Sequence, residues 1–193
     1  MARITVLPAT ADRFDDVEMT LTGGGDGKSC QCQWWLLTNR EFEGTTQDER
    51  MRMLQDETAL PVPPGLVAQV DGQAAGWVRV GPRSILRRFA RSRIYGPNAQ
   101  GSWEDEDVWA ISCFSVRREF RGQGVSRALL TAAVEQARAE GARRVEAYPR
   151  DTSVSRPSAN ELFRGALSSF LAAGFSETAR PRPDRPIVSL ELT

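Results

Sequence analysis

The chain has 193 residues, of which 40% are hydrophobic, so it is long enough to bury a core without disulfides or metals. We expect one domain spanning residues 1–193. Lys and Arg together number 25, as do Asp and Glu. This balance excludes the strong basic field that draws proteins to nucleic acid or to anionic membranes. An apolar run of about 18 residues and a signal-peptide pattern are both missing, which favours a cytoplasmic protein.

The sequence contains no histidine. This excludes Ser-His and Cys-His hydrolase mechanisms and removes the commonest metal ligand. Three cysteines, Cys30, Cys32 and Cys113, fit reduced thiols, and Cys113 lies in an apolar run where core packing is favoured. A zinc site would need a fourth ligand that the sequence does not supply, so we expect no metal.

The first half of the sequence alternates between strand and helix patterns. β-Branched residues at every second position indicate a strand, and apolar residues at helical spacing indicate helices. The pair Asp71-Gly72 is one that a two-residue hairpin turn favours. The predicted elements are a strand at 3–7, a helix at 11–21, a glycine-rich loop at 23–27, a helix at 45–60 and hairpin strands at 66–70 and 74–80.

The second half contains a βαβ pattern. The nearly continuous apolar run at 108–116 is typical of a central strand covered on both faces, and an apolar stripe at helical spacing follows it. Glycines mark the ends of two helices. The predicted elements are a short helix or ordered loop at 84–93, a surface connection at 96–107, a strand at 108–116, helices at 124–140 and 162–173, and strands at 145–148 and 187–192.

The loop between the central strand and its helix has the properties of an anion site. Gly122 and Gly124 allow the backbone to approach a ligand closely, and the N–H groups at the start of the helix favour phosphate. The segment Arg121-Gly122-Gln123-Gly124-Val125-Ser126 resembles the motif of Gcn5-related N-acetyltransferases: Gln or Arg, two residues, Gly, one residue, then Gly or Ala. Ser126 departs from the motif but is nearly as small. The resemblance extends over residues 108–176.

The resemblance implies a fold, a cofactor and a set of site residues. The fold is of the α/β (α+β) class, a mixed central sheet of about six to seven strands flanked by helices and splayed at the central strand. The co-substrate is acetyl-CoA. Backbone groups of Phe114 and Val116 would pair with its pantetheine arm like an added strand. The pyrophosphate would bind to Arg121, Gly122, Gln123, Gly124, Val125, Ser126 and Arg127, with Arg118 as a further phosphate contact.

The usual acid and base of the family are missing. Their positions hold Ala110 on the central strand and Phe170 before the final Gly-Phe. Our replacement candidates for catalysis are Tyr148, Glu146 and Ser169, with Ser168 and Ser112 as alternatives. A water relay is a further alternative.

Trp34, Trp35 and Trp103 lie in predicted loops and are our candidates for the acceptor pocket, whereas Trp77 and Trp109 lie in strands and are assigned to the core. Glu106, in the acidic run 104–107, would attract a cationic amine. The sequence therefore predicts a bacterial N-acetyltransferase acting on a small-molecule amine, without nucleic-acid or membrane partners. Dimerisation is common in the family, so a homodimer is included in this prediction.

Three other functions fit parts of the sequence. The main alternative is a non-catalytic acyl-CoA-binding regulatory module on the same fold, because the acid and base are missing. Residues 23–29 end in Gly-Lys-Ser as a P-loop does, but the required first glycine is Thr22 and the loop follows a helix. A nucleic-acid-binding module would rest on the arginines of 83–93, where aromatic residues are scarce.

Overall fold

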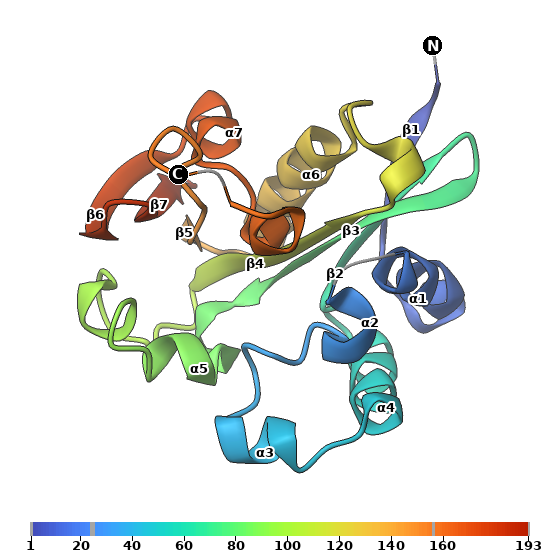
Figure 1. Cartoon of the computed structure of the whole chain (residues 1–193), viewed down its shortest axis with the longest axis horizontal. Helices are drawn as coiled ribbons and strands as arrows, with labels where there is room; N and C mark the ends of the chain where they lie inside the picture. The colour runs from blue at the N-terminus through green and yellow to red at the C-terminus, as the bar shows by residue number, and fades with distance from the viewer. Residues whose placement is uncertain (1, 24–25, 156, 193) are drawn as a thin grey trace.

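The computed structural model describes residues 2–23, 26–155 and 157–192. Its centre is a seven-stranded mixed sheet with the strand order β1-β2-β3-β4-β5-β7-β6 (Figure 1). Only the β4–β5 pair is parallel among the neighbouring pairs of described strands. The strands are β1 Ile4–Pro8, β2 Gly65–Val70, β3 Gln73–Pro82, β4 Val108–Val116, β5 Arg144–Ala147, β6 Ser176–Arg182 and β7 Arg185–Glu191.

Helices cover both faces of this sheet (Figure 1). On one face α6 packs against β2 and β3, and on the other α1 packs against β3. The helices are α1 Phe14–Thr22, α2 Gly27–Cys30, α3 Asn39–Glu43, α4 Gln47–Thr58, α5 Arg87–Ala90, α6 Val125–Ala139 and α7 Leu167–Ala172. The mixed, flanked sheet confirms the predicted fold class.

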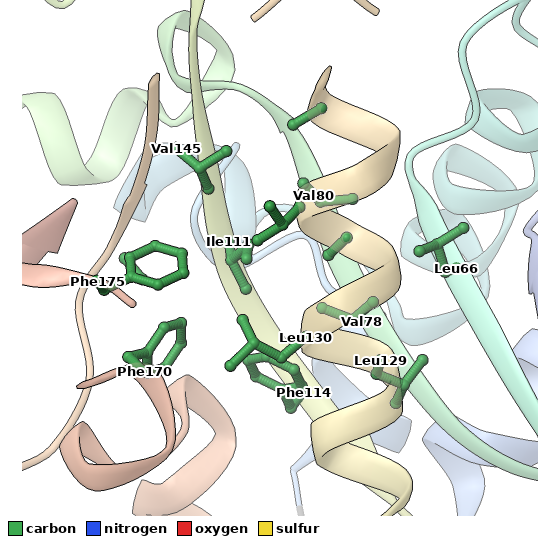
Figure 2. Close-up of a cluster of buried hydrophobic side chains, with 14 of the residues drawn as sticks. Leu66, Val78, Val80, Ile111, Phe114, Leu129, Leu130, Val145, Phe170 and Phe175 are labelled. Atoms are coloured by element: carbon green, nitrogen blue, oxygen red, sulfur yellow. The ribbon is translucent and has the colours of Figure 1, made fainter. Parts of the chain in front are cut away.

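The main hydrophobic core lies between the sheet and α6. Leu129 and Leu130 of α6 pack with Val78 and Ile111 of the sheet, and Phe170 and Phe175 close the core at the α7 end (Figure 2). A second cluster on the opposite face joins α1, α4 and Trp77. The apolar stripes that predict these helices therefore face the sheet as expected.

A β-bulge in β4 decides which side chains face which layer. The pairing with β3 runs from Arg79↔Cys113 to Val80↔Ile111, so Ser112 is the extra residue. As a result Ile111 and Phe114 both pack in the main core, whereas Cys113 packs with the opposite cluster. Without the bulge, strict alternation would place Ile111 and Cys113 on the same face.

The sheet opens beside β4. Strand β5 pairs with β4 only over Val108–Ile111, although β4 continues to Val116. The C-terminal half of β4 therefore has no β5 partner among the described residues. This confirms the splayed central strand that the family resemblance implies.

The predicted elements are largely confirmed, with differences at their ends. Asp71 and Gly72 adopt positive φ angles of 49° and 82°, as the tight hairpin turn requires. The helix predicted over 162–173 is wrong, because Gly165 at φ 80° divides it into a 3₁₀ turn at Ala159–Arg164 and α7. Strand β6 and the short helices α2 and α3 were not predicted, since their sequences lack a regular apolar period.

Candidate acyl-transfer site

A cavity of about 550 Å³ opens next to the unpaired half of β4. Residues from five parts of the chain line it: the end of α1, α2 with the segments on either side of it, α3, β4 with the glycine loop after it, and the 3₁₀ turn before α7. The lining residues are Leu21, Asp26, Gly27, Ser29, Cys30, Cys32, Trp34, Trp35, Phe42, Cys113, Phe114, Ser115, Val116, Arg121, Ser126, Asn160, Leu162 and Phe163.

The backbone of β4 faces this cavity at Phe114 and Val116. The N–H of Arg117 donates to the carbonyl of Ala75 on β3, so residue 117 forms a hydrogen-bonded pair with that strand. Hydrogen-bonded and non-hydrogen-bonded pairs alternate along an antiparallel ladder. The N–H and C=O groups of Phe114 and Val116 therefore point away from β3, toward the gap left by β5. This free edge suits an extended ligand that binds as an added strand.

The glycine loop ends at the N-terminus of α6. Gly122 and Gly124 have φ angles of 77° and 87°, which L-residues with a side chain rarely adopt. Gly124 is the N-cap of α6 and supplies no side chain to cap the first N–H groups, so these groups can bind an anion. Val125 is buried and packs in the core, so only its backbone can contact a ligand.

The predicted phosphate contacts lie on both sides of this loop. Arg121 and Ser126 line the main cavity, and Arg121 Nε donates to the Val116 carbonyl at 3.2 Å. Gln123, Gly124 and Arg127 line a second, shallower hollow beside α6. The α6 N-terminus thus lies between the two hollows, where a ligand could extend from one to the other.

Aromatic side chains form part of the cavity wall. Trp34 and Phe42 meet edge to face, with ring centroids 5.0 Å apart. The guanidinium of Arg88 lies 3.7 Å above the Trp34 ring, and Trp35 stacks on Phe89 with centroids 3.8 Å apart. These contacts hold both tryptophans in place and present an apolar surface to a ligand.

Two thiols lie side by side in the lining. Cys32 Sγ is 3.3 Å from Cys113 Sγ, and Trp77 Nε1 donates to Cys32 Sγ at 3.0 Å. Cys32 and the preceding Gln31 have φ angles of 53° and 47°, which are uncommon for residues with a side chain. The fold therefore holds Cys32 against β4 at the expense of some local backbone strain.

Comparison with known proteins decides the family. Residues 32–166 match the model described as the acetyltransferase (GNAT) family. The chain belongs to this family. The GNAT assignment confirms both the family prediction and the predicted enzyme class, an acetyltransferase. No curated protein matches the chain.

Many solved GNAT-like structures share this fold. The protein yncA of Salmonella typhimurium, solved with its cofactor acetyl-CoA, is 16% identical with a TM-score of 0.58, over 98% of this chain and 94% of that one. An N-acetyltransferase of Staphylococcus aureus Mu50 is 14% identical with a TM-score of 0.57, over 99% of both chains. The diaminobutyrate acetyltransferase EctA of Paenibacillus lautus was solved with L-2,4-diaminobutyric acid and coenzyme A. It is 14% identical with a TM-score of 0.53, over 99% of this chain and 96% of that one. At these identities the likeness shows the fold.

Two predicted catalytic residues of this GNAT chain are buried away from the cavity. Glu146 and Arg83 are 0% exposed and form an ion pair at 2.6 Å, and Tyr148 Oη donates to Glu146 at 3.0 Å. Burial raises the pKa of Tyr148 well above its usual value, helped by the adjacent carboxylate. Tyr148 also stacks on Phe89, with centroids 4.2 Å apart. Neither residue lines the cavity, and Glu146 instead holds Arg83, which donates to the carbonyls of Gln100 and Ser102 in the loop before β4.

Three further residues predicted for catalysis or acceptor binding, Ser169, Glu106 and Trp103, also lie outside the cavity. Ser169 is exposed on α7, and Glu106 is exposed in the acidic run. Trp103 Nε1 donates to the Gly96 carbonyl at 3.0 Å, and the guanidinium carbon of Arg83 lies 4.9 Å from the centroid of the Trp103 ring. The acidic run contacts Arg143, which pairs with Asp105 at 3.4 Å and with Asp107 at 2.7 Å. Glu106 is not part of these two pairs, and its attraction of a cationic amine stays a prediction.

The site includes residues that the sequence does not single out. The pair Cys32 and Cys113, and the apolar residues Phe42, Leu162 and Phe163, line the cavity with the predicted Trp34 and Trp35. The position of Cys32, two residues before the predicted Trp34, is the one available signal. Cys113 packs against the second hydrophobic cluster, as its assignment to the core predicts, and nothing in the sequence indicates that it also lines the cavity.

Metal-binding clusters and membrane-spanning helices are both missing from the described part of the chain. No group of three or more His, Cys, Asp or Glu side chains in residues 2–23, 26–155 and 157–192 is arranged to hold a metal ion. Among the helices of the same residues, none is long and apolar enough to cross a membrane.

Proposed function

We propose that the protein transfers an acetyl group from acetyl-CoA to the primary amine of a small molecule, by direct attack in a ternary complex. One observation carries the proposal. A single cavity joins the free backbone edge of β4, the glycine loop at α6 and an aromatic pocket. A thioester on β4 and an amine in the pocket would therefore meet in the same enclosed space.

Acetyl-CoA suits the β4 side of the site. The extended pantetheine arm would pair with Phe114 and Val116, and the pyrophosphate would bind the N–H groups at Gly124 and Ser126. Arg121 and Arg127 would add charge-assisted contacts to the phosphates. The complexes of the Salmonella protein with acetyl-CoA and of the Thermoplasma acidophilum N-acetyltransferase with coenzyme A support this choice.

The geometry assists the chemical step by positioning and by hydrogen bonding. Holding the thioester and the amine together converts a bimolecular step into one within a complex. A free N–H on β4, at Phe114 or Val116, would donate to the carbonyl oxygen as negative charge develops on it. This contribution needs no side-chain acid.

The pocket favours an amine attached to an apolar or aromatic group. Trp34, Trp35, Phe42, Leu162 and Phe163 line it, and such surfaces bind ligands by burying apolar area. The diaminobutyrate acetyltransferase shows that a protein of this fold can act on a small molecule. A cytoplasmic location would supply acetyl-CoA and keep the cysteines reduced.

An acceptor screen tests the proposal. Release of the CoA thiol from acetyl-CoA is followed with aromatic amines such as 2-phenylethylamine and tryptamine, and with spermidine and an aminoglycoside. We expect the aromatic amines to give the higher kcat/KM, and Trp34→Ala to lower it about 10-fold by removing buried apolar contacts. Acetyl-CoA binding without turnover of any amine would contradict the proposal and favour the non-catalytic acyl-CoA-binding module.

A further inference from the structure

The cavity contains a pair of thiols that the proposed function does not use. Cys32 is 3% exposed and comes from the loop after α2, and Cys113 comes from β4 next to Phe114. Their sulfur atoms are 3.3 Å apart, within hydrogen-bonding distance for sulfur. The two sulfurs can therefore share a proton.

Trp77 decides which sulfur carries the negative charge when the pair loses a proton. An indole N–H can donate a hydrogen bond but cannot accept one. Trp77 Nε1 donates to Cys32 Sγ at 3.0 Å, so in the pair that has lost one proton this indole N–H stabilises the charge on Cys32. The remaining S–H then belongs to Cys113, which donates to Cys32. Cys32 thus has two donors for its thiolate.

Two charged groups beside the pair act on the Cys32 thiolate in opposite directions. Arg79 of β3 and Glu57 of α4 form an ion pair beside Cys32. Arg79 is buried, and its Nε and Nη1 have no hydrogen-bond partner among the described residues, so part of its charge is available to a nearby anion. Glu57 acts in the opposite direction, toward a neutral thiol.

The three thiols of the cavity respond differently to these surroundings. Hydrogen bonding from Cys113 and the charge of Arg79 lower the pKa of Cys32, despite its burial. The hydrogen bond to Cys32 raises the pKa of Cys113 well above its usual value. Burial and the nearby Cys32 raise the pKa of Cys30 to about 11, so Cys30 stays protonated at neutral pH.

We propose that the Cys32 thiolate, held by Cys113 and Trp77, accepts the proton of the acceptor amine during acetyl transfer. This inference rests on the proposed function. The amine nitrogen bonds to the thioester carbonyl carbon, the C–S bond breaks, and CoA leaves as a thiolate. The proton lost by nitrogen goes to Cys32. It then passes to the CoA thiolate, so the Cys32–Cys113 pair returns to its starting state.

The first test does not depend on acetyl transfer. The rate of alkylation by iodoacetamide is measured against pH under reducing conditions, and each modified cysteine is located by peptide mass spectrometry. We expect Cys32 to react with a midpoint below that of an ordinary cysteine, about 8.5, and Cys30 to react with a higher midpoint. Glu57→Gln should move the Cys32 midpoint to lower pH, because it removes a negative charge.

The second test uses the same variants in turnover. In the parent, kcat/KM should rise with pH through the midpoint found by alkylation, since only the thiolate can accept a proton. Glu57→Gln should move both midpoints together. Cys32→Ser should lower kcat about 10²-fold or more and remove this ionisation from the profile. The thermal shift produced by acetyl-CoA should persist in Cys32→Ser, which would show that the variant is folded.

Two results would overturn the inference while leaving the proposed function intact. One is a Cys32→Ser variant with the parent's kcat and pH profile. The other is an alkylation midpoint for Cys32 at or above the ordinary value in a protein that still acetylates amines. Absence of turnover in the parent, with Cys32 titrating low, would instead count against the proposed function.

Discussion

Arg83 and Glu146 form an ion pair with both side chains 0% exposed, and without the Glu146 charge the buried Arg83 keeps only the more distant Asp105, at 4.0 Å. We predict that Glu146→Gln lowers the free energy of unfolding by about 3–5 kcal/mol. For a chain of this length this corresponds to a fall in Tm of about 6–20 °C, measurable by circular dichroism. The exposed pair of Arg144 and Glu191 provides the control, and Glu191→Gln should cost less than about 1 kcal/mol.

The same variant separates a structural from a catalytic role for Glu146. If the carboxylate were the general base, kcat would fall about 10²-fold or more at temperatures where the variant is still folded. The buried ion pair predicts that the loss of stability is the main effect. A Glu146→Gln enzyme with unchanged stability and a large loss of kcat would contradict this structural role.

Among the elements, α6 is placed by a close contact with β3. A Cβ added at Gly76 would lie 2.8 Å from Val125 Cγ1 and 3.1 Å from Leu129 Cδ1, so this glycine lets the start of the helix approach the sheet. We predict that Gly76→Ala lowers stability by about 1–3 kcal/mol. It should also weaken acetyl-CoA binding, because the glycine loop is attached to the displaced helix end.

A second glycine of β3 is the matched control. A Cβ at Gly81 would meet its nearest neighbour, Ile85 Cδ1, at an ordinary 3.8 Å. Gly81→Ala should therefore leave both the Tm and the acetyl-CoA affinity close to those of the parent. Equal effects of the two substitutions, measured by thermal unfolding and isothermal titration calorimetry, would contradict the role of Gly76.

The elements also show what the sequence could predict. The apolar run of β4 and the stripe of α6 identify the central βαβ unit, because burial on a sheet imposes a regular period. The glycine loop is recognisable since its φ angles require glycine. The bulge at Ser112 leaves no such mark, because tertiary contacts and not a local period determine it. Gly165 is visible in the sequence, but an isolated glycine does not by itself show that a helix is divided. Cys113 packs against the second hydrophobic cluster, as the core prediction expects, but the sequence does not show that it also lines the cavity.

For the whole molecule, the splayed sheet explains why residues distant in sequence meet at one cavity. Strand β5 leaves β4 after Ile111, and the space between them is lined by the loop after α2, by β4 and by the turn before α7. Some of the predicted residues come together there, whereas the predicted acid and base candidates do not; those that do are Phe114, Val116, Arg121, Ser126, Trp34 and Trp35. The central claim is that acetyl-CoA binds along β4 and at the start of α6.

The most direct test of this claim is thermal unfolding with and without acetyl-CoA in the parent, Gly124→Glu and Gly141→Glu. Both glycines have positive φ at opposite ends of α6, with little around them, so the two variants carry the same strain and charge. At about one hundred times its Kd, acetyl-CoA should stabilise the parent and Gly141→Glu by about 2.7 kcal/mol, or about 5–11 °C, and Gly124→Glu far less. No shift in the parent at any concentration, or an equal shift in all three proteins, would contradict the account.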